Sequence, residues 1–171
     1  MDEKDERLSI PVISIVGGMA NSGKTTLLEK IIREAKRRKW RVATLKHDVH
    51  GFEMDQPGKD TWRHAQAGAD IVAISSPRKI AILESVADDQ PLDEVLARIQ
   101  GVDVIFTEGY KHENKPKIEV YRSAVHYALF SKPEELMAIV SDITFDNGIP
   151  CFGLDDAQGI CDLIARKFGL V

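Results

Sequence analysis

The chain lacks the features that mark exported, membrane-spanning and disulfide-stapled proteins. It has two cysteines among 171 residues, Cys151 and Cys161, with no Cys-x-x-Cys spacing. No apolar run approaches the roughly 20 residues that cross a bilayer, and the charged start Met1–Arg7 is unlike a secretory signal peptide. We therefore predict a soluble, cytoplasmic protein whose two thiols are reduced and lie in the core.

An excess of positive charge is also lacking. The chain has 23 Lys+Arg against 27 Asp+Glu, a net charge of −4, which disfavours a surface that wraps nucleic acid. The length and the 43% hydrophobic fraction are typical of one globular domain. We expect a charged N-terminal tail over residues 1–8 and a single domain over residues 9–171. Local phosphate binding stays open, because a few backbone N–H groups can hold a phosphate without a basic surface.

Short apolar runs alternate with longer amphipathic stretches. The runs Ile10–Val16 and Val102–Thr107 predict buried strands, and helical spacing of apolar residues predicts a helix over Lys24–Lys39. The segment Lys117–Tyr121 alternates like a half-exposed strand, which could pair across subunits at a sheet edge or form an internal hairpin. Further strands are expected at 41–46, 71–75, 79–83, 137–140 and 149–152, and further helices at 59–67, 91–99 and 156–168. The pattern predicts a three-layer α/β fold with a mostly parallel central sheet and some antiparallel edge strands.

One segment matches a phosphate-binding loop. Residues 18–25 read Gly-Met-Ala-Asn-Ser-Gly-Lys-Thr, which fits G-x-x-x-x-G-K-[ST]. This spacing lets consecutive backbone N–H groups point at phosphate oxygens, and the following helix presents its positive end to the same anion. Lys24 is expected to reach the β- and γ-phosphates, and the Thr25 hydroxyl to bind Mg²⁺. The fold is therefore expected to be that of a P-loop NTPase.

Two more groups are expected at the carboxyl edge of the sheet, where open α/β sheets bind ligands. Glu108 ends an apolar strand and resembles a Walker-B acid with Glu in place of the usual Asp; a solvated acid in a turn is the alternative. The polar loop from His47 onward follows another strand at this edge, so its side chains are expected near the phosphates. His47 and His50 have an H-x-x-H spacing, but no third and fourth ligand is evident, so zinc is not predicted.

Three blocks of residues resemble the MobB family, the molybdopterin-guanine dinucleotide biosynthesis protein B family. The first block is Ile15–Leu27, which holds the phosphate-binding loop. The second joins Lys46, His47, His50 and Asp55 to Pro57–Thr61 and Ala67–Ala69. The third is Glu108–His112 followed by Pro116–Val120. Together they extend from about Ile13 to Arg122, and the residues after Arg122 match weakly.

The resemblance implies GTP and Mg²⁺ binding, slow GTP hydrolysis, a homodimer, and an accessory role beside a MobA-type guanylyltransferase that joins GMP to molybdopterin. Neither a membrane nor a nucleic-acid partner is expected, because of the apolar runs and the net charge described above. Carried over by position, Lys24, Asp55 and Glu108 are the expected catalytic groups, and Thr25, Asp55 and Glu108 the expected Mg²⁺ ligands. Residues from the loop after Lys46 are expected to face molybdopterin or the partner. The residues expected to bind nucleotide or molybdopterin are Gly18, Met19, Ala20, Asn21, Ser22, Gly23, Lys24, Thr25, Thr26, His47, His50, Lys59 and Asp60.

Two other classes of protein stay open. A small-molecule P-loop kinase needs an arginine-bearing lid, for which only the isolated Arg78 and Arg122 are candidates. A metallochaperone-type GTPase would be expected to carry Cys/His metal motifs and an Asn-Lys-x-Asp motif, and neither is present. Without that motif, GTP over ATP rests on the resemblance, with Ser141-Asp142 as a candidate for the guanine edge. No glutamine or arginine finger is obvious near the phosphates, which predicts weak intrinsic GTPase activity.

Overall fold

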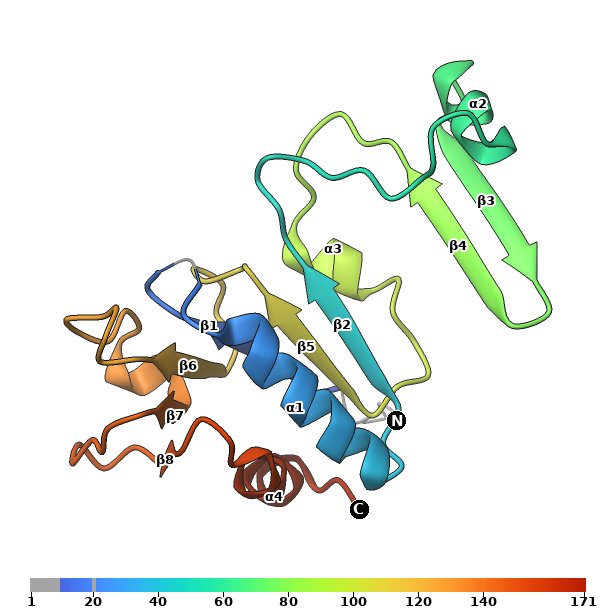
Figure 1. Ribbon diagram of the computed structural model, residues 1–171. Helices are drawn as coiled ribbons and strands as arrows, with labels where there is room; N and C mark the ends of the chain where they lie inside the picture. The colour runs from blue at the N-terminus through green and yellow to red at the C-terminus, as the bar shows by residue number, and fades with distance from the viewer. Residues whose placement is uncertain (1–9, 20) are drawn as a thin grey trace, which may run out of the picture. The chain divides into compact units, whose positions relative to one another are not determined.

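The computed structural model of the chain describes residues 10–19 and 21–171. The described residues form two compact units (Figure 1): one contains the chain up to His47 together with Ile99–Val171, and the other is Asp48–Arg98. The predicted tail over residues 1–8 and Ala20 of the phosphate-binding loop lie outside the described residues. The single domain over residues 9–171 stays a prediction. Of the helices described, none is long and apolar enough to cross a membrane.

The first unit contains a six-stranded sheet in the order β2-β5-β1-β6-β7-β8. Every neighbouring pair in it is parallel. The strands are rich in Val and Ile and several are buried along their length, as expected for a parallel sheet. The predicted mostly parallel sheet is therefore confirmed. The strands are β1 (Val12–Val16), β2 (Val42–Lys46), β5 (Val104–Glu108), β6 (Lys117–Tyr121), β7 (Leu136–Ser141) and β8 (Cys151–Phe152).

The prediction for β6 is wrong, because this strand lies inside the sheet between β1 and β7 and all its residues are buried. The charged residues Lys117 and Glu119 of this strand bind groups in a later segment of the chain. Lys117 Nζ lies 3.1 Å from a carboxylate oxygen of Glu135, in the short 3₁₀ helix Pro133–Glu135. The Glu119 carboxylate accepts backbone N–H groups from the segment that follows β6. A charged residue at every second position therefore indicates buried partners here and does not indicate a solvent-facing side.

Two helices of the first unit, α1 (Lys24–Arg37) and α4 (Ala157–Phe168), pack against each other and contribute to one hydrophobic core with the strands. From α1, Ile31 and Ala35 are completely buried, and so are Ile160 and Ile164 from α4. The side chains at helical spacing thus face the core, as the sequence predicts. The second helical layer of the predicted three-layer arrangement stays a prediction, because the remaining α-helices belong to the other unit.

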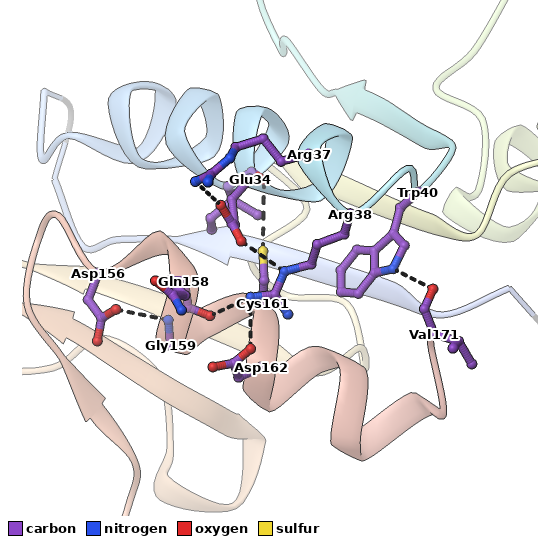
Figure 2. A network of polar contacts seen from close by, with 11 residues as sticks. Glu34, Arg37, Arg38, Trp40, Asp156, Gln158, Gly159, Cys161, Asp162 and Val171 are labelled. Carbon is purple, nitrogen blue, oxygen red and sulfur yellow. Dashed lines mark hydrogen bonds and ion pairs between the residues drawn. The ribbon is translucent and has the colours of Figure 1, made fainter.

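Polar contacts join the end of α1 to α4 (Figure 2). The Arg38 guanidinium contacts Glu34 at 2.9 Å and Asp162 at 2.7 Å. Cys161 is completely buried against α1, and this burial raises the pKa of its thiol to about 11. Cys151 is only partly buried, so the prediction that both thiols lie in the core is confirmed for Cys161 and wrong for Cys151; the reduced state stays a prediction.

The second unit contains a separate antiparallel sheet of two strands, β3 (Ile71–Ser76) and β4 (Lys79–Glu84), with α2 (Asp60–Gln66) and α3 (Leu92–Leu96). The antiparallel strands of the prediction therefore form a sheet of their own. In the register Val72 pairs with Leu83, and both line a pocket that is also lined by the start of α2. The other side of the hairpin exposes Ile71, Ile80 and Ile82.

Candidate functional site

The phosphate-binding loop connects β1 to α1. Asn21 and Gly23 adopt positive φ values of 59° and 95°, which curl the backbone before the helix begins. A Cβ atom on Gly17 would lie 2.6 Å from the hydroxyl of buried Ser22 and 3.1 Å from the carbonyl oxygen of Val120. Glycine is therefore required at position 17 for close packing at the base of the loop. Gly17 lies outside the G-x-x-x-x-G-K-[ST] motif. The only sequence signal for its packing role is that it forms a Gly17-Gly18 doublet with the first residue of the motif.

The ammonium group of Lys24 is folded back over the loop. Its Nζ donates to the carbonyl oxygen of Met19 at 2.9 Å and to the Ser22 hydroxyl at 3.1 Å. Partial burial lowers the pKa of Lys24 and the positive charge of Lys111 lowers it further, while Glu108 opposes both effects. A bound anion would offset the unfavourable terms. The loop is therefore suited to a ligand with negative charge.

The hydroxyl of Thr25 and the carboxylate of Glu108 are in direct contact, with Thr25 Oγ1 donating to Oε1 at 2.9 Å. The fold produces this pair because Glu108 ends β5, where it lies in register with Ile15 of β1, just before the loop. Hydroxyl and carboxylate oxygens are ligands that Mg²⁺ prefers, and Mg²⁺ at a nucleotide needs few protein ligands beside the phosphates. The pair therefore fits the metal that a nucleoside triphosphate brings.

His47 lies beside this pair at the end of β2. Its backbone N–H donates to the carbonyl oxygen of Glu108 at 2.9 Å, and its ring stacks on Tyr110 with centroids 4.7 Å apart. Gly109, which stands between Glu108 and Tyr110 in the chain, has a φ of 110°. A Cβ atom at this position would lie 2.9 Å from His47 Cβ. The structure thus places Lys24, Thr25, Glu108 and His47 at one edge of the parallel sheet.

The remaining predicted residues belong to the second unit. Asp55 Oδ1 accepts from the Gln56 N–H at 2.8 Å and from the Thr61 hydroxyl at 3.0 Å. Its Oδ2 is buried and has no hydrogen-bond partner among the described residues. Lys59, Asp60 and Asp55 line the pocket of about 590 Å³ beside the β3–β4 hairpin, while His50 is exposed. The role of Asp55 toward Mg²⁺ stays a prediction.

Among the described residues, no group of three or more His, Cys, Asp and Glu side chains could hold a metal ion.

The carboxylate of Asp142, the candidate for the guanine edge, accepts hydrogen bonds from Ser123. The Ser123 N–H donates at 2.8 Å and the Ser123 hydroxyl at 3.0 Å, and these contacts lower the pKa of Asp142.

Of three residues beside the loop, His126 and Phe130 were not predicted from the sequence, and Arg122 was predicted only as a candidate for a kinase lid. A Cβ on Gly23 would lie 4.0 Å from Cδ of Arg122, and one on Gly18 would lie 3.5 Å from both the His126 ring and Phe130. No short motif marks these positions, because they reach the loop only through the pairing of β6 with β1.

Comparison with known proteins agrees with this geometry. The family described as "Molybdopterin guanine dinucleotide synthesis protein B" (MobB) matches residues 12–142. The chain belongs to the MobB family. A molybdopterin-guanine dinucleotide biosynthesis adapter protein of Escherichia coli is 30% identical over 167 residues, covering 92% of this chain and 93% of the relative. The protein of the same name from Haemophilus influenzae is 31% identical over 157 residues, covering 91% and 88%.

Solved MobB structures have the same fold. The crystal structure of Bacillus subtilis MobB has a TM-score of 0.72 at 28% identity, and it covers 92% of this chain and 98% of that one. Another MobB crystal structure has a TM-score of 0.70 at 29% identity. The predicted P-loop NTPase fold class is thereby confirmed. The likeness to MobB also extends beyond Ile13–Arg122, the segment on which the sequence resemblance rests.

Proposed function

We propose that this MobB-family chain is a GTP-binding adapter that assists a MobA-type guanylyltransferase in joining GMP to molybdopterin, which forms molybdopterin guanine dinucleotide. The observation that carries the nucleotide part is the contact of Thr25 Oγ1 with Glu108 at 2.9 Å, beside a lysine folded over the loop. The adapter part is supported by the names of the relatives in Escherichia coli and Haemophilus influenzae.

The residues of the loop have separate tasks in this proposal. The backbone N–H groups from Gly18 to Thr26 bind phosphate oxygens, and Lys24 exchanges its contact with the Met19 carbonyl for a phosphate. Thr25 and Glu108 would hold Mg²⁺, which neutralises charge on the phosphates. The ammonium group of Lys24 already lies over the loop, so rotation of its side chain would bring it to a phosphate.

We expect hydrolysis of GTP to be slow. Rapid GTPases place an arginine or glutamine against the transferred phosphoryl group, and its absence lowers the rate by about 10³–10⁵. Arg122 is the arginine nearest the loop by the contacts described, but its side chain is exposed and approaches Gly23 only through Cδ. A purified chain that turned over GTP several times per second without a partner would contradict this expectation.

The pocket of the second unit is the proposed contact for molybdopterin. Lys59 and Lys79 can bind the phosphate of that ligand, while Asp55 has a buried oxygen that is free to accept from a pterin N–H. Apolar side chains of the hairpin, such as Val72 and Leu83, can contact a flat ring. His50 and Asp60 would extend this surface toward the partner.

A homodimer is the proposed assembly. The side of the β3–β4 hairpin that exposes Ile71, Ile80 and Ile82 is an apolar surface, and such surfaces often contact another protein chain. Sedimentation equilibrium checks this directly: the expected mass is twice the chain mass of 19.1 kDa. A mass of one chain at micromolar concentration would remove the dimer from the proposal.

The adapter function is tested by measuring the formation of molybdopterin guanine dinucleotide by the guanylyltransferase with and without this chain. We expect the wild-type chain to raise the yield, and Lys24→Ala to lose that effect because the loop then lacks its phosphate-binding ammonium group. Arg33→Ala is the matched control, since Arg33 is an exposed cation on α1 that pairs only with Glu29 among the described residues. Equal stimulation by wild type and Lys24→Ala would refute the role of the loop in this function.

A further inference from the structure

The segment between β6 and the 3₁₀ helix passes directly beside the phosphate-binding loop. A Cβ atom on Gly18 would lie 3.5 Å from His126 Cδ2, 3.5 Å from Phe130 Cβ and 4.0 Å from His126 Nε2. These distances place the His126 ring and Phe130 directly beside Gly18. His126 and Phe130 supply the three atoms that lie nearest to a Cβ on Gly18, the first residue of the loop.

Buried polar contacts hold this segment in place. The Glu119 carboxylate, which is completely buried in β6, accepts the N–H groups of Phe130 at 2.6 Å and Ser131 at 2.9 Å. The Tyr121 hydroxyl donates to the His126 carbonyl oxygen at 3.1 Å. These contacts tie both the middle and the end of the segment to a strand of the sheet. The position of His126 against Gly18 is therefore fixed by the fold.

The hydrogen bonds of the His126 ring determine which nitrogen carries its proton. The backbone N–H of Arg122 donates to Nδ1 at 3.0 Å. The carbonyl oxygen of Arg122 also lies near Nδ1, at 3.1 Å, but it already accepts the N–H groups of Val125 and His126. Nδ1 is therefore the acceptor, and we assign the proton of the neutral ring to Nε2.

The Nε2–H group of His126 is a buried donor with no acceptor among the residues that the structure describes. The residue is 6% exposed, and its Nε2 has no hydrogen-bond partner among the described residues. Buried donors without partners are rare in folded proteins, and each requires a physical explanation. Here the ring lies beside Gly18 at the start of the loop, and the Lys111 ammonium group lies 5.1 Å from the ring centroid of Phe130, which also lies beside Gly18. A negatively charged oxygen is the acceptor that this surrounding favours.

We propose that His126 is an additional nucleotide-binding residue, whose Nε2–H donates to a phosphate oxygen of the nucleotide held by the loop. The inference rests on the proposed function, because it needs a nucleotide in that loop. A neutral donor suits this position, since it binds the phosphate without adding a third positive charge beside Lys24 and Lys111.

Two substitutions separate the two ring nitrogens. His126→Asn keeps an acceptor near the Nδ1 position for the Arg122 N–H and removes the Nε2 donor, whereas His126→Gln can place an amide donor near the Nε2 position. Calorimetric titration with Mg·GTP should give about a tenfold to hundredfold weaker Kd for His126→Asn, the usual effect of one hydrogen bond to a charged group. His126→Gln should recover most of the affinity. The control is Tyr127→Ala, which removes a fully exposed side chain from the same segment and should leave the Kd unchanged.

The outcomes distinguish this inference from the proposed function. If the wild-type chain binds no nucleotide, the proposed function and the inference both fail. If the wild type binds Mg·GTP and His126→Asn binds it equally well, the inference alone fails. Should His126→Asn not fold, NMR of the wild-type imidazole decides: Mg·GTP should shift the Nε2–H resonance downfield and slow its exchange with water. An unchanged Nε2–H resonance at saturating Mg·GTP would overturn the inference.

Discussion

Replacing Gly109 by alanine tests how closely His47 and the end of β5 are packed. The backbone at Gly109 has a φ of 110°, and holding a residue with a Cβ in such a conformation costs about 1–2 kcal/mol. The new Cβ would also lie 2.9 Å from His47 Cβ and 3.0 Å from the His47 carbonyl oxygen. Nonbonded carbon atoms prefer about 3.5–4.0 Å, so His47 must move, and overpacking of this kind costs about 1–3 kcal/mol. The expected loss of stability is about 2–5 kcal/mol.

The assay is urea-induced unfolding followed by circular dichroism, with Gly148→Ala as the control. Gly148 also has a positive φ, of 76°, but a Cβ there would meet no described atom within 4 Å. The control should therefore lose only the backbone part, about 1–2 kcal/mol. Gly109→Ala should in addition weaken Mg·GTP binding, because the His47 N–H contacts the carbonyl oxygen of Glu108. Equal destabilisation by the two substitutions would refute the packing of His47 against Gly109.

Two further predictions concern the Cys161 thiol and the Glu135 carboxylate. Because Cys161 is completely buried and its pKa is raised to about 11, only Cys151 should react with a thiol reagent at mildly alkaline pH, and Cys161 only after unfolding; rapid reaction of both in the folded chain would contradict this. The hydrogen bond from Lys117 lowers the pKa of Glu135 from its usual 4.5. The contact of the Glu135 carboxylate with Lys117 therefore stabilises the folded chain fully above pH 4.5, and this stabilisation is lost as the pH falls through the lower pKa of the folded state. The difference in unfolding free energy between wild type and Glu135→Gln should therefore shrink below pH 4.5, and a difference that does not change with pH would disprove the pairing.

The sequence predicts the phosphate-binding loop well because its chemistry depends on consecutive residues. The spacing from Gly18 to Thr25 determines both the turn and the start of α1, and the structure contains both. The position of Glu108 was predictable for a similar reason: a buried parallel strand places its last residue at the carboxyl edge of the sheet. These local rules account for the main features of the first unit.

Contacts between distant segments explain what the sequence did not predict. The alternation of Lys117 and Glu119 looks like an exposed face, but their partners Glu135 and Phe130 come from a later segment that no local pattern connects to β6. His126 reaches Gly18 only because that segment is tied to the sheet. The sequence also does not mark the two compact units, because the composition of residues 48–98 does not differ from that of the rest in an obvious way.

Calorimetric titration of the full chain with GTP, in the presence and absence of Mg²⁺, tests the central claim most directly. The structure predicts one nucleotide per chain, tighter binding with Mg²⁺ because Thr25 and Glu108 lie together at the loop, and loss of binding in Lys24→Ala. Unchanged affinity for GTP in Lys24→Ala, or no binding by the wild type at millimolar GTP with Mg²⁺, would contradict the account.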